Sequence, residues 1–79
     1  MSMKDRDQME AGGARLRRRR QDLGISLATM ATALDVTVSA VAQWERGETE
    51  PDAGKRPKLA KLLKVPVFSA LYEGVSRDG

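Results

Sequence analysis

Two residue types that are common in enzyme active sites are missing from this sequence. Its 79 residues include no cysteine and no histidine. Without cysteine the chain can form no disulfides and no thiolate metal sites, and without histidine it lacks the commonest metal ligand and the commonest general base. We therefore expect a protein without a metal, a cofactor or an enzymatic activity.

A group of acidic residues does not change this expectation. Its members are Glu45, Glu48, Glu50 and Asp52. No nucleophile, phosphate-binding loop or metal-ligand spacing accompanies these carboxylates, and a solvated acidic loop is a sufficient explanation for them.

Long apolar runs are also missing. No stretch approaches the roughly 20 apolar residues that span a bilayer, and the segment from Met1 to Met9 is charged. We expect a cytoplasmic protein with no membrane partner.

The residues that are present have the composition of one small folded domain. Hydrophobic residues make up 41% of the chain, charged residues make up 32%, and the net charge is +3. Basic residues gather in two segments, from Arg15 to Arg20 and from Lys55 to Lys64. Two separated basic segments suit a surface that straddles a polyanion, although a solvated helix face would explain either segment alone.

The two ends of the chain differ from its middle. Residues 1–13 are polar and end in Gly12-Gly13, a pattern that predicts a flexible N-terminal arm, with a remnant of expression as the alternative. The folded domain is then expected to span residues 14–74, and residues 75–79 are expected to form a frayed tail. The first helix of this domain is predicted to run from Ala14 to Leu23 and to end at Gly24.

Two short helices with clear capping signals follow. Ser26 can cap a helix from Leu27 to Leu34, and Thr37 can cap a helix from Val38 that ends at Gly47. Asp35-Val36-Thr37 contains turn-forming residues and connects the two.

The last third of the sequence predicts two more helices. Residues 48–54 are predicted to be a loop, and Pro57 then opens a helix that carries Leu59, Leu62 and Leu63 on one stripe. After Pro66, residues 67–72 predict a short fifth helix. The domain is therefore expected to be all-α, with five helices.

The informative feature is the spacing between the second and third helices. Two short helices joined by a three-residue turn can cross steeply only if a small side chain lies at the crossing, and Ala31 is that residue. The apolar residues expected to form a shared core around it are Met30, Leu34, Val36, Val41 and Trp44. This pattern predicts a helix-turn-helix from Leu27 to Arg46, with a generic helical hairpin as the alternative.

The outward face of the third helix follows from its buried face. If Val41 and Trp44 point inward, the 100° step per residue turns Ser39, Ala42, Gln43 and Arg46 outward, and Val38 lies at the exposed amino-terminal end of the helix. In the major groove of DNA, glutamine can form two hydrogen bonds to adenine, serine can bond several base edges, and valine can contact a thymine methyl group. These three residues are the candidate base readers; a solvated helix face is the alternative.

Several segments resemble one known family. They are Leu23-Gly24-Ile25-Ser26, Ala31, Val36-Thr37, the run from Gln43 to Pro51, and Leu59-Ala60-Lys61-Leu62-Leu63. Together they resemble the lambda-repressor-like domain of phage repressors and Cro proteins. The resemblance implies a compact five-helix domain that binds an approximately palindromic operator in double-stranded DNA as a homodimer. It also implies that the first, second and sixth residues of the third helix read bases, and these are again Val38, Ser39 and Gln43.

The same resemblance assigns roles outside the third helix. It implies an ion pair between Arg20 and Glu45 that anchors this helix. It places a set of phosphate contacts around the groove, namely Ser26, Thr37, Arg46, Lys55, Arg56 and Arg17. It places the dimer contact in the last helix, at Val67, Phe68, Leu71 and Tyr72, although Phe68 can equally fill the core of its own domain.

Two positions depart from the family pattern. Leu27 stands where the family often has a glutamine that bonds a phosphate, so that contact is expected from Ser26 or a backbone amide. Asp35 stands at the turn position usually held by glycine, and aspartate tolerates the left-handed conformation better than most residues.

We expect a transcription repressor of the short, Cro-like kind, since the chain stops at Gly79 without a second domain; a truncated repressor is the alternative. An antitoxin of a toxin–antitoxin pair would use the same domain and would also bind a protein partner. A third hypothesis is an RNA-binding protein that uses the arginine-rich stretch from Ala14 to Arg20.

Overall fold

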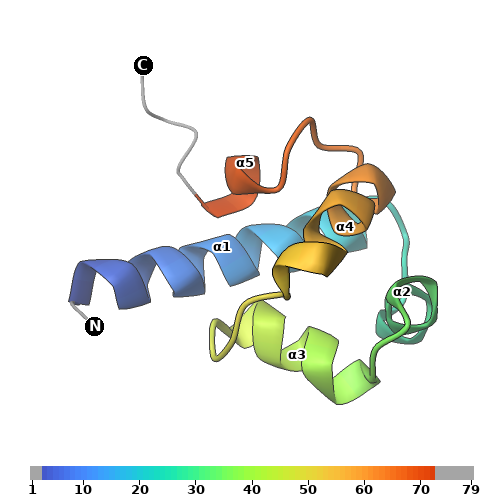
Figure 1. Ribbon diagram of the computed structural model, residues 1–79, viewed down its shortest axis with the longest axis horizontal. Helices are drawn as coiled ribbons and strands as arrows, with labels where there is room; N and C mark the ends of the chain where they lie inside the picture. The colour runs from blue at the N-terminus through green and yellow to red at the C-terminus, as the bar shows by residue number, and fades with distance from the viewer. Residues whose placement is uncertain (1–2, 73–79) are drawn as a thin grey trace.

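The structure is a computed structural model that describes residues 3–72, and these form five α-helices and one short 3-10 helix (Figure 1). The helices are α1 (Met3–Asp22), α2 (Leu27–Leu34), α3 (Val38–Arg46), α4 (Arg56–Leu62) and α5 (Ser69–Tyr72), and the 3-10 helix is η1 (Ala53–Lys55). No strand occurs in this part of the chain, so the predicted all-α fold is confirmed.

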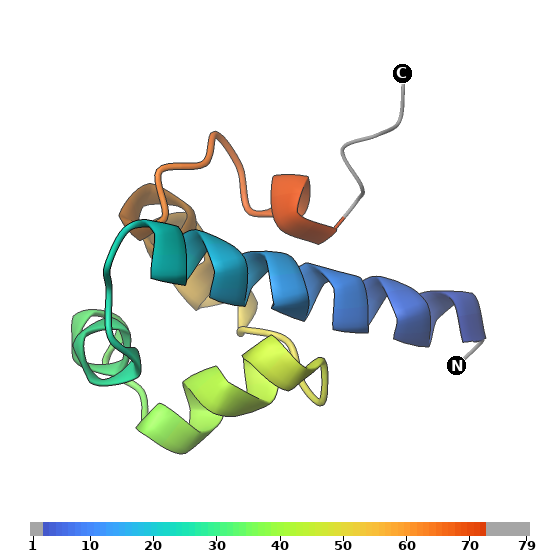
Figure 2. The same ribbon diagram turned by 180° about the vertical axis from the view of Figure 1, so that it is seen from behind.

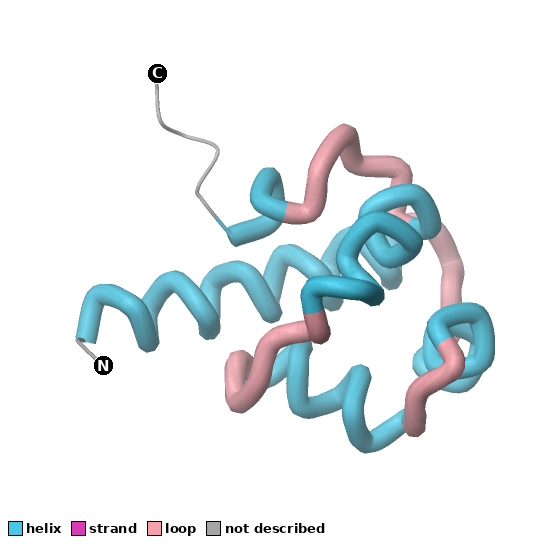
Figure 3. Tube along the Cα trace, in the orientation of Figure 1, coloured by secondary structure: helices cyan, strands magenta, loops and turns pink. Residues whose placement is uncertain are grey.

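The long helix α1 runs through the middle of the arrangement. Helix α3 lies along one side of it and α5 along the other, and both views show the same order (Figures 1 and 2). Helix α2 lies beyond the C-terminal end of α1. Loops of a few residues connect the helices (Figure 3). None of the described helices is long and apolar enough to cross a membrane.

The predicted N-terminal arm is wrong for residues 3–13. These residues are helical, and α1 begins at Met3 rather than at Ala14. Gly12-Gly13 has the composition of a helix breaker, but both glycines are buried inside α1. Their packing offsets their low helix propensity, which costs about 1 kcal/mol per residue relative to alanine.

The predicted bounds of α2 and the predicted start of α3 are confirmed, as are both caps. The Ser26 hydroxyl accepts a hydrogen bond of 3.0 Å from the Thr29 amide, and the Thr37 hydroxyl accepts one of 3.0 Å from the Ala40 amide. Asp35 adopts the left-handed conformation, with φ of 57°, and its amide donates back to α2. The turn therefore forms without a glycine.

The last elements differ in detail from the prediction. The predicted loop 48–54 ends in η1, α4 begins one residue before Pro57, and α5 begins at Ser69 rather than at Val67. The predicted tail at residues 75–79 and the end of the predicted domain at residues 73–74 lie outside the described residues.

The hydrophobic core joins all five helices. Its buried members are Leu16, Met30, Ala31, Leu34, Val41, Trp44, Leu59, Leu63 and Leu71. Val36 packs against this cluster but is only partly buried. Ala31 is therefore part of the main core of the domain, together with Val41 and Trp44 of α3, and this core fixes α3 relative to the other helices.

Candidate nucleic-acid interface

The outward face of α3 has the predicted composition. Val41 and Trp44 are 0% and 5% exposed, while Val38 is 45% exposed and Ser39 is also exposed. Gln43 is half-buried. The acidic residue of α3, Glu45, is turned away into an ion pair, so the outward face of this helix carries no negative charge. A neutral or cationic helix face suits an anionic partner.

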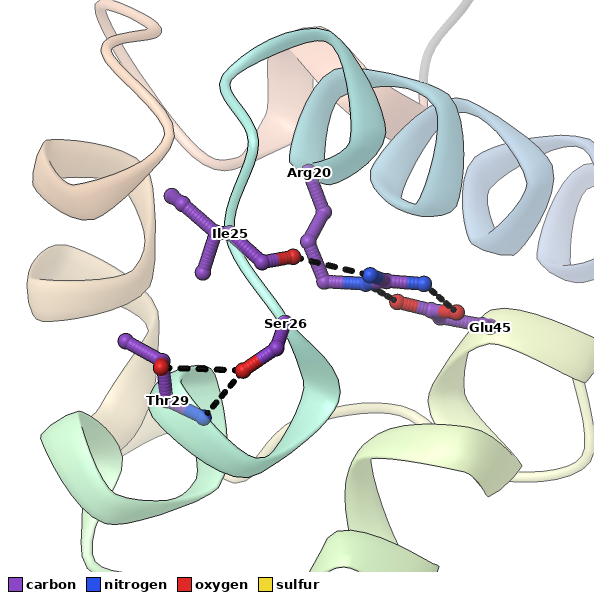
Figure 4. A network of polar contacts seen from close by, with 5 residues as sticks. All are labelled: Arg20, Ile25, Ser26, Thr29 and Glu45. Atoms are coloured by element: carbon purple, nitrogen blue, oxygen red, sulfur yellow. Dashed lines mark hydrogen bonds and ion pairs between the residues drawn. The ribbon is translucent and has the colours of Figure 1, made fainter.

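The buried partner of Glu45 is Arg20 of α1 (Figure 4). Arg20 Nε and Nη2 donate to the two carboxylate oxygens at 2.6 and 3.1 Å, and Nη1 donates to the Ile25 carbonyl at 2.9 Å. The two side chains are only 10% and 7% exposed. This contact ties α3 to α1 and to the segment that leads into α2.

The two capping residues differ in what they can offer to a phosphate. Ser26 donates its hydroxyl proton to Thr29 Oγ1 at 2.9 Å, so it must break this bond before it can donate to a phosphate. Thr37 uses only its acceptor capacity, toward the Ala40 amide, and its proton remains available. Of the two expected phosphate contacts, Thr37 is the better placed chemically.

Arg46 lies exposed at the end of α3 and pairs with Glu48. Its Nε and Nη2 donate to the two Glu48 carboxylate oxygens at 2.8 and 3.1 Å. The hydrogen bond and the positive charge of Arg46 hold the pKa of the Glu48 carboxyl below its usual range, and Glu48 in turn raises the pKa of Arg46. Both groups are therefore charged at neutral pH, and a phosphate would compete with Glu48 for Arg46.

Lys55 and Arg56 stand at the start of α4, and both are partly buried. Arg56 Nε donates to the Pro51 carbonyl at 2.9 Å, and its guanidinium lies 4.9 Å from the centre of the Phe68 ring. It also pairs with Glu50 at 3.2 Å. Arg56 thus connects the loop after α3 to the segment before α5, a structural role that no pattern in the sequence indicates.

Most arginines of the arginine-rich stretch of α1 form hydrogen bonds with other parts of the domain. Arg15 Nη1 donates to the Leu71 carbonyl at 2.6 Å, and Arg19 Nε donates to the Leu63 carbonyl at 2.8 Å. The carbonyls of the last turn of a helix have no hydrogen-bond partner within that helix, and these two bonds supply one to a carbonyl in α5 and one at the end of α4. Arg17 and Arg18 are exposed, and Arg18 pairs with Asp22 at 3.4 Å.

The expected dimer residues do not share one surface. Leu71 is 5% exposed and belongs to the core, so its assignment to a dimer contact is wrong. Phe68 is half-buried against the same core, which agrees with the alternative role given to it. Val67 is 55% exposed. The side chain of Tyr72 lies outside the described residues.

Comparison with known proteins assigns the chain to a family. A model of the helix-turn-helix family matches residues 16–68, and the chain therefore belongs to this family, of the lambda-repressor-like type. The chain is similar to repressor protein C2 of Salmonella phage P22, with 40% identity over 52 residues that cover 66% of this chain and 24% of that protein. It is 38% identical to the transcriptional regulator DicA of Escherichia coli over 52 residues, which cover 66% of this chain and 38% of DicA.

One solved structure and a further relative give the same result. A crystal structure of the P22 c2 repressor in complex with a synthetic operator matches with a TM-score of 0.74 and 36% identity, covering 80% of this chain and 94% of that one. An uncharacterized transcriptional regulator of Sinorhizobium medicae is 31% identical over 67 residues, which cover 85% of this chain and 48% of the relative. The chain thus spans about half the length, or less, of the curated relatives that it matches.

Proposed function

We propose that this chain is a sequence-specific double-stranded DNA-binding transcription regulator that inserts α3 into the major groove. The observation that carries the proposal is the composition of the outward face of α3. This face carries Val38, Ser39 and Gln43 and no acidic residue, because Glu45, the acidic residue of α3, is buried in its ion pair with Arg20. The likeness to an operator-bound repressor at 36% identity supports the same orientation of α3. Such a regulator acts in the cytoplasm.

The phosphate contacts in this proposal come from residues around α3. Thr37 at its start and Arg46 at its end are exposed, and Lys55 and Arg17 extend the cationic surface on other elements. Arg56 and Ser26 contribute less, because Arg56 is partly buried and bound to the Pro51 carbonyl and Ser26 donates to Thr29. Arg46 also has a partner, Glu48, but that pair is exposed, so a phosphate can replace Glu48 there. Each phosphate that is neutralised steepens the salt dependence of binding by about one unit.

The finer proposal is a Cro-like repressor that binds as a homodimer. Exposed Val67 lines a mostly apolar groove between α4 and the segment before α5, together with Ala53, Pro57, Ala60, Val65, Pro66 and Phe68 and the cationic residues Arg56 and Lys61. This supports a dimer contact at Val67 in place of the buried Leu71.

Selection of bound duplexes from random DNA tests the proposed function. We expect a consensus with two inverted half-sites whose centres are about 10 base pairs apart, one helical turn of DNA. Footprinting then maps the protected bases. A consensus with a single half-site would overturn the dimer, and the absence of any consensus would overturn sequence-specific binding.

Replacing Gln43 by alanine tests its role as a base reader. Loss of a two-hydrogen-bond contact is expected to reduce discrimination at one base pair of each half-site by about 1–3 kcal/mol. The measurement is the affinity for the selected duplex and for duplexes changed at that base pair. Gln8→Ala, an exposed position on α1, is the matched control and should change neither. Equal weakening of all duplexes by Gln43→Ala would exclude base reading by Gln43.

The structure does not favour RNA binding through α1. Three arginines of that stretch, Arg15, Arg19 and Arg20, donate to groups inside the domain. An RNA-binding helix needs its guanidinium groups on the surface, and of the arginines in this stretch only Arg17 and Arg18 are exposed.

A further inference from the structure

Helix α1 and the last turn of α3 touch through their backbones, and Gly13 makes this contact possible. Gly13 is buried in α1. A carbon atom in the position of a side-chain Cβ there would lie 2.6 Å from the Glu45 carbonyl oxygen and would also collide with the Trp44 carbonyl oxygen. Both obstacles are backbone atoms of α3, so no side-chain rotation can make room.

Gly47 makes the reverse contact from the other helix. It ends α3 with φ of 78°, and a Cβ there would lie 2.7 Å from the Cα of Glu10 and 2.9 Å from its backbone nitrogen. Glu10 and Gly13 are neighbours on one face of α1, one turn apart. Each helix thus offers a glycine to the backbone of the other. We call this contact the glycine seat, formed by Gly13 and Gly47 with Glu10, Trp44 and Glu45.

The glycine seat and the buried ion pair hold the same residue of α3. Gly13 lies against the backbone carbonyl of Glu45, and Arg20 binds the Glu45 carboxylate. Gly13 and Arg20 are seven residues apart, or about 10 Å along one face of α1. The last turn of α3 is therefore fixed to α1 in two ways, through the backbone of Glu45 against Gly13 and through the side chain of Glu45 bound to Arg20.

This turn also carries the candidate base reader. Gln43 directly precedes Trp44, whose carbonyl oxygen lies in the glycine seat. Hydrogen bonds weaken when the donor-to-acceptor distance leaves a window of a few tenths of an ångström, about 2.7–3.2 Å. A displacement of the turn by the size of a methyl group would carry Gln43 outside that window.

We propose that Gly13 is a positioning residue that sets the base selectivity of α3 by allowing this turn to lie directly on α1. The proposal rests on the proposed DNA-binding function and adds a residue that contacts no DNA. In Gly13→Ala the methyl group pushes the end of α3 away from α1 while Arg20 still holds the Glu45 side chain, so α3 tilts.

The test compares Gly13→Ala with two alanine variants at other glycines of the same chain. Gly24 has φ of 70° and open space around its Cβ position, so Gly24→Ala introduces backbone strain without touching α3. Gly54 also has open space and no such φ, so Gly54→Ala is the neutral control. The measured quantity is the ratio of dissociation constants for a scrambled duplex and for the selected operator duplex.

The ratio of dissociation constants distinguishes a displaced α3 from a simple loss of stability. A smaller folded fraction lowers the affinity for both duplexes by the same factor and leaves their ratio unchanged. If Gly13→Ala is incompletely folded in buffer, the same ratio is measured in trimethylamine N-oxide, which favours the folded chain. Emission from Trp44, which is the single tryptophan of the chain, reports the displacement of α3 without DNA.

We expect the ratio to fall about tenfold in Gly13→Ala, within the range for loss of a good base contact, and to stay unchanged in both controls. Trp44 emission should shift in Gly13→Ala only. An unchanged ratio in Gly13→Ala, or an equal fall in Gly24→Ala, would overturn the positioning role while leaving the proposed function intact. Equal binding of both duplexes by the wild-type chain would overturn the proposed function itself, and the selectivity role with it.

Discussion

Replacing Glu45 by glutamine is expected to lower the free energy of unfolding by about 3–5 kcal/mol, the usual cost of removing one partner from a buried ion pair. The Arg20 guanidinium, whose side chain is 10% exposed, would remain in the domain without a counter-charge. Glutamine keeps the size of the side chain and one acceptor oxygen. The decrease in the free energy of unfolding therefore reports the missing charge and not the creation of a cavity. Urea denaturation followed by circular dichroism gives the free energy.

Glu48→Gln is the matched control for this prediction. It makes the same chemical change three residues away, in a pair whose side chains are 57% and 53% exposed. Solvent screens that pair, so its removal is expected to change stability by less than about 1 kcal/mol. We also expect Glu45→Gln to change stability more than base preference. Equal losses in the two variants would show that the Arg20–Glu45 pair contributes no more than a surface pair.

The parts of the fold that the sequence predicts well are those fixed by nearby residues. Ser26 and Thr37 cap the helices that follow them through bonds that reach only three residues along the chain. Asp35 ends α2 in a similarly local way, because its amide donates to the carbonyls of Ala31 and Thr32, four and three residues earlier. Because these signals are short in range and agree with the apolar spacing around Ala31, both helices of the helix-turn-helix begin where the sequence places them.

The start of α1 could not be predicted in this way. Gly12-Gly13 favours a break when only its neighbours are considered. The reason for the continuous helix is a contact with Trp44 and Glu45, about 30 residues further along the chain. Contacts at such a separation leave no pattern of spacing in a single sequence.

The same limit applies to the cationic side chains. Arg15 and Arg19 belong to a basic segment that suggests a surface patch, but they donate to the carbonyls of Leu71 and Leu63. The Arg20–Glu45 pair was expected only because of a family resemblance, not from spacing. By contrast, the outward residues of α3 follow from one rotation argument with Val41 and Trp44 inward, and their contacts with bases stay a prediction.

The assignment of Leu71 failed for a related reason. An apolar residue near the end of a chain can cover its own core or a partner, and its sequence neighbours do not separate the two. The Arg15 bond to the Leu71 carbonyl and the burial of the Leu71 side chain show that α5 closes the core over α1. The proposed dimer contact is therefore placed beside α5, at Val67, which is 55% exposed.

Replacing Ala31 by leucine is the second large effect that we expect, and it tests the crossing of α2 and α3 directly. Ala31 is 4% exposed in the core that the two helices share. Extra methylene groups in a packed core usually cost about 1–3 kcal/mol, because neighbouring side chains and backbone must move. Because Ala31 shares the core with Val41 and Trp44 of α3, a leucine there should displace α3 relative to α2, and binding to the selected operator should weaken more than the lost stability alone explains.

Ala28→Leu provides the control on the same helix. Ala28 is exposed, and the substitution changes helix propensity there by the same small amount as at Ala31. Its stability should therefore stay within about 0.5 kcal/mol of the wild-type chain. Urea denaturation and operator binding are measured for both variants under the same conditions. If Ala31→Leu is as stable as Ala28→Leu, the crossing has room for a large side chain, and the small residue at position 31 does not determine how α2 meets α3.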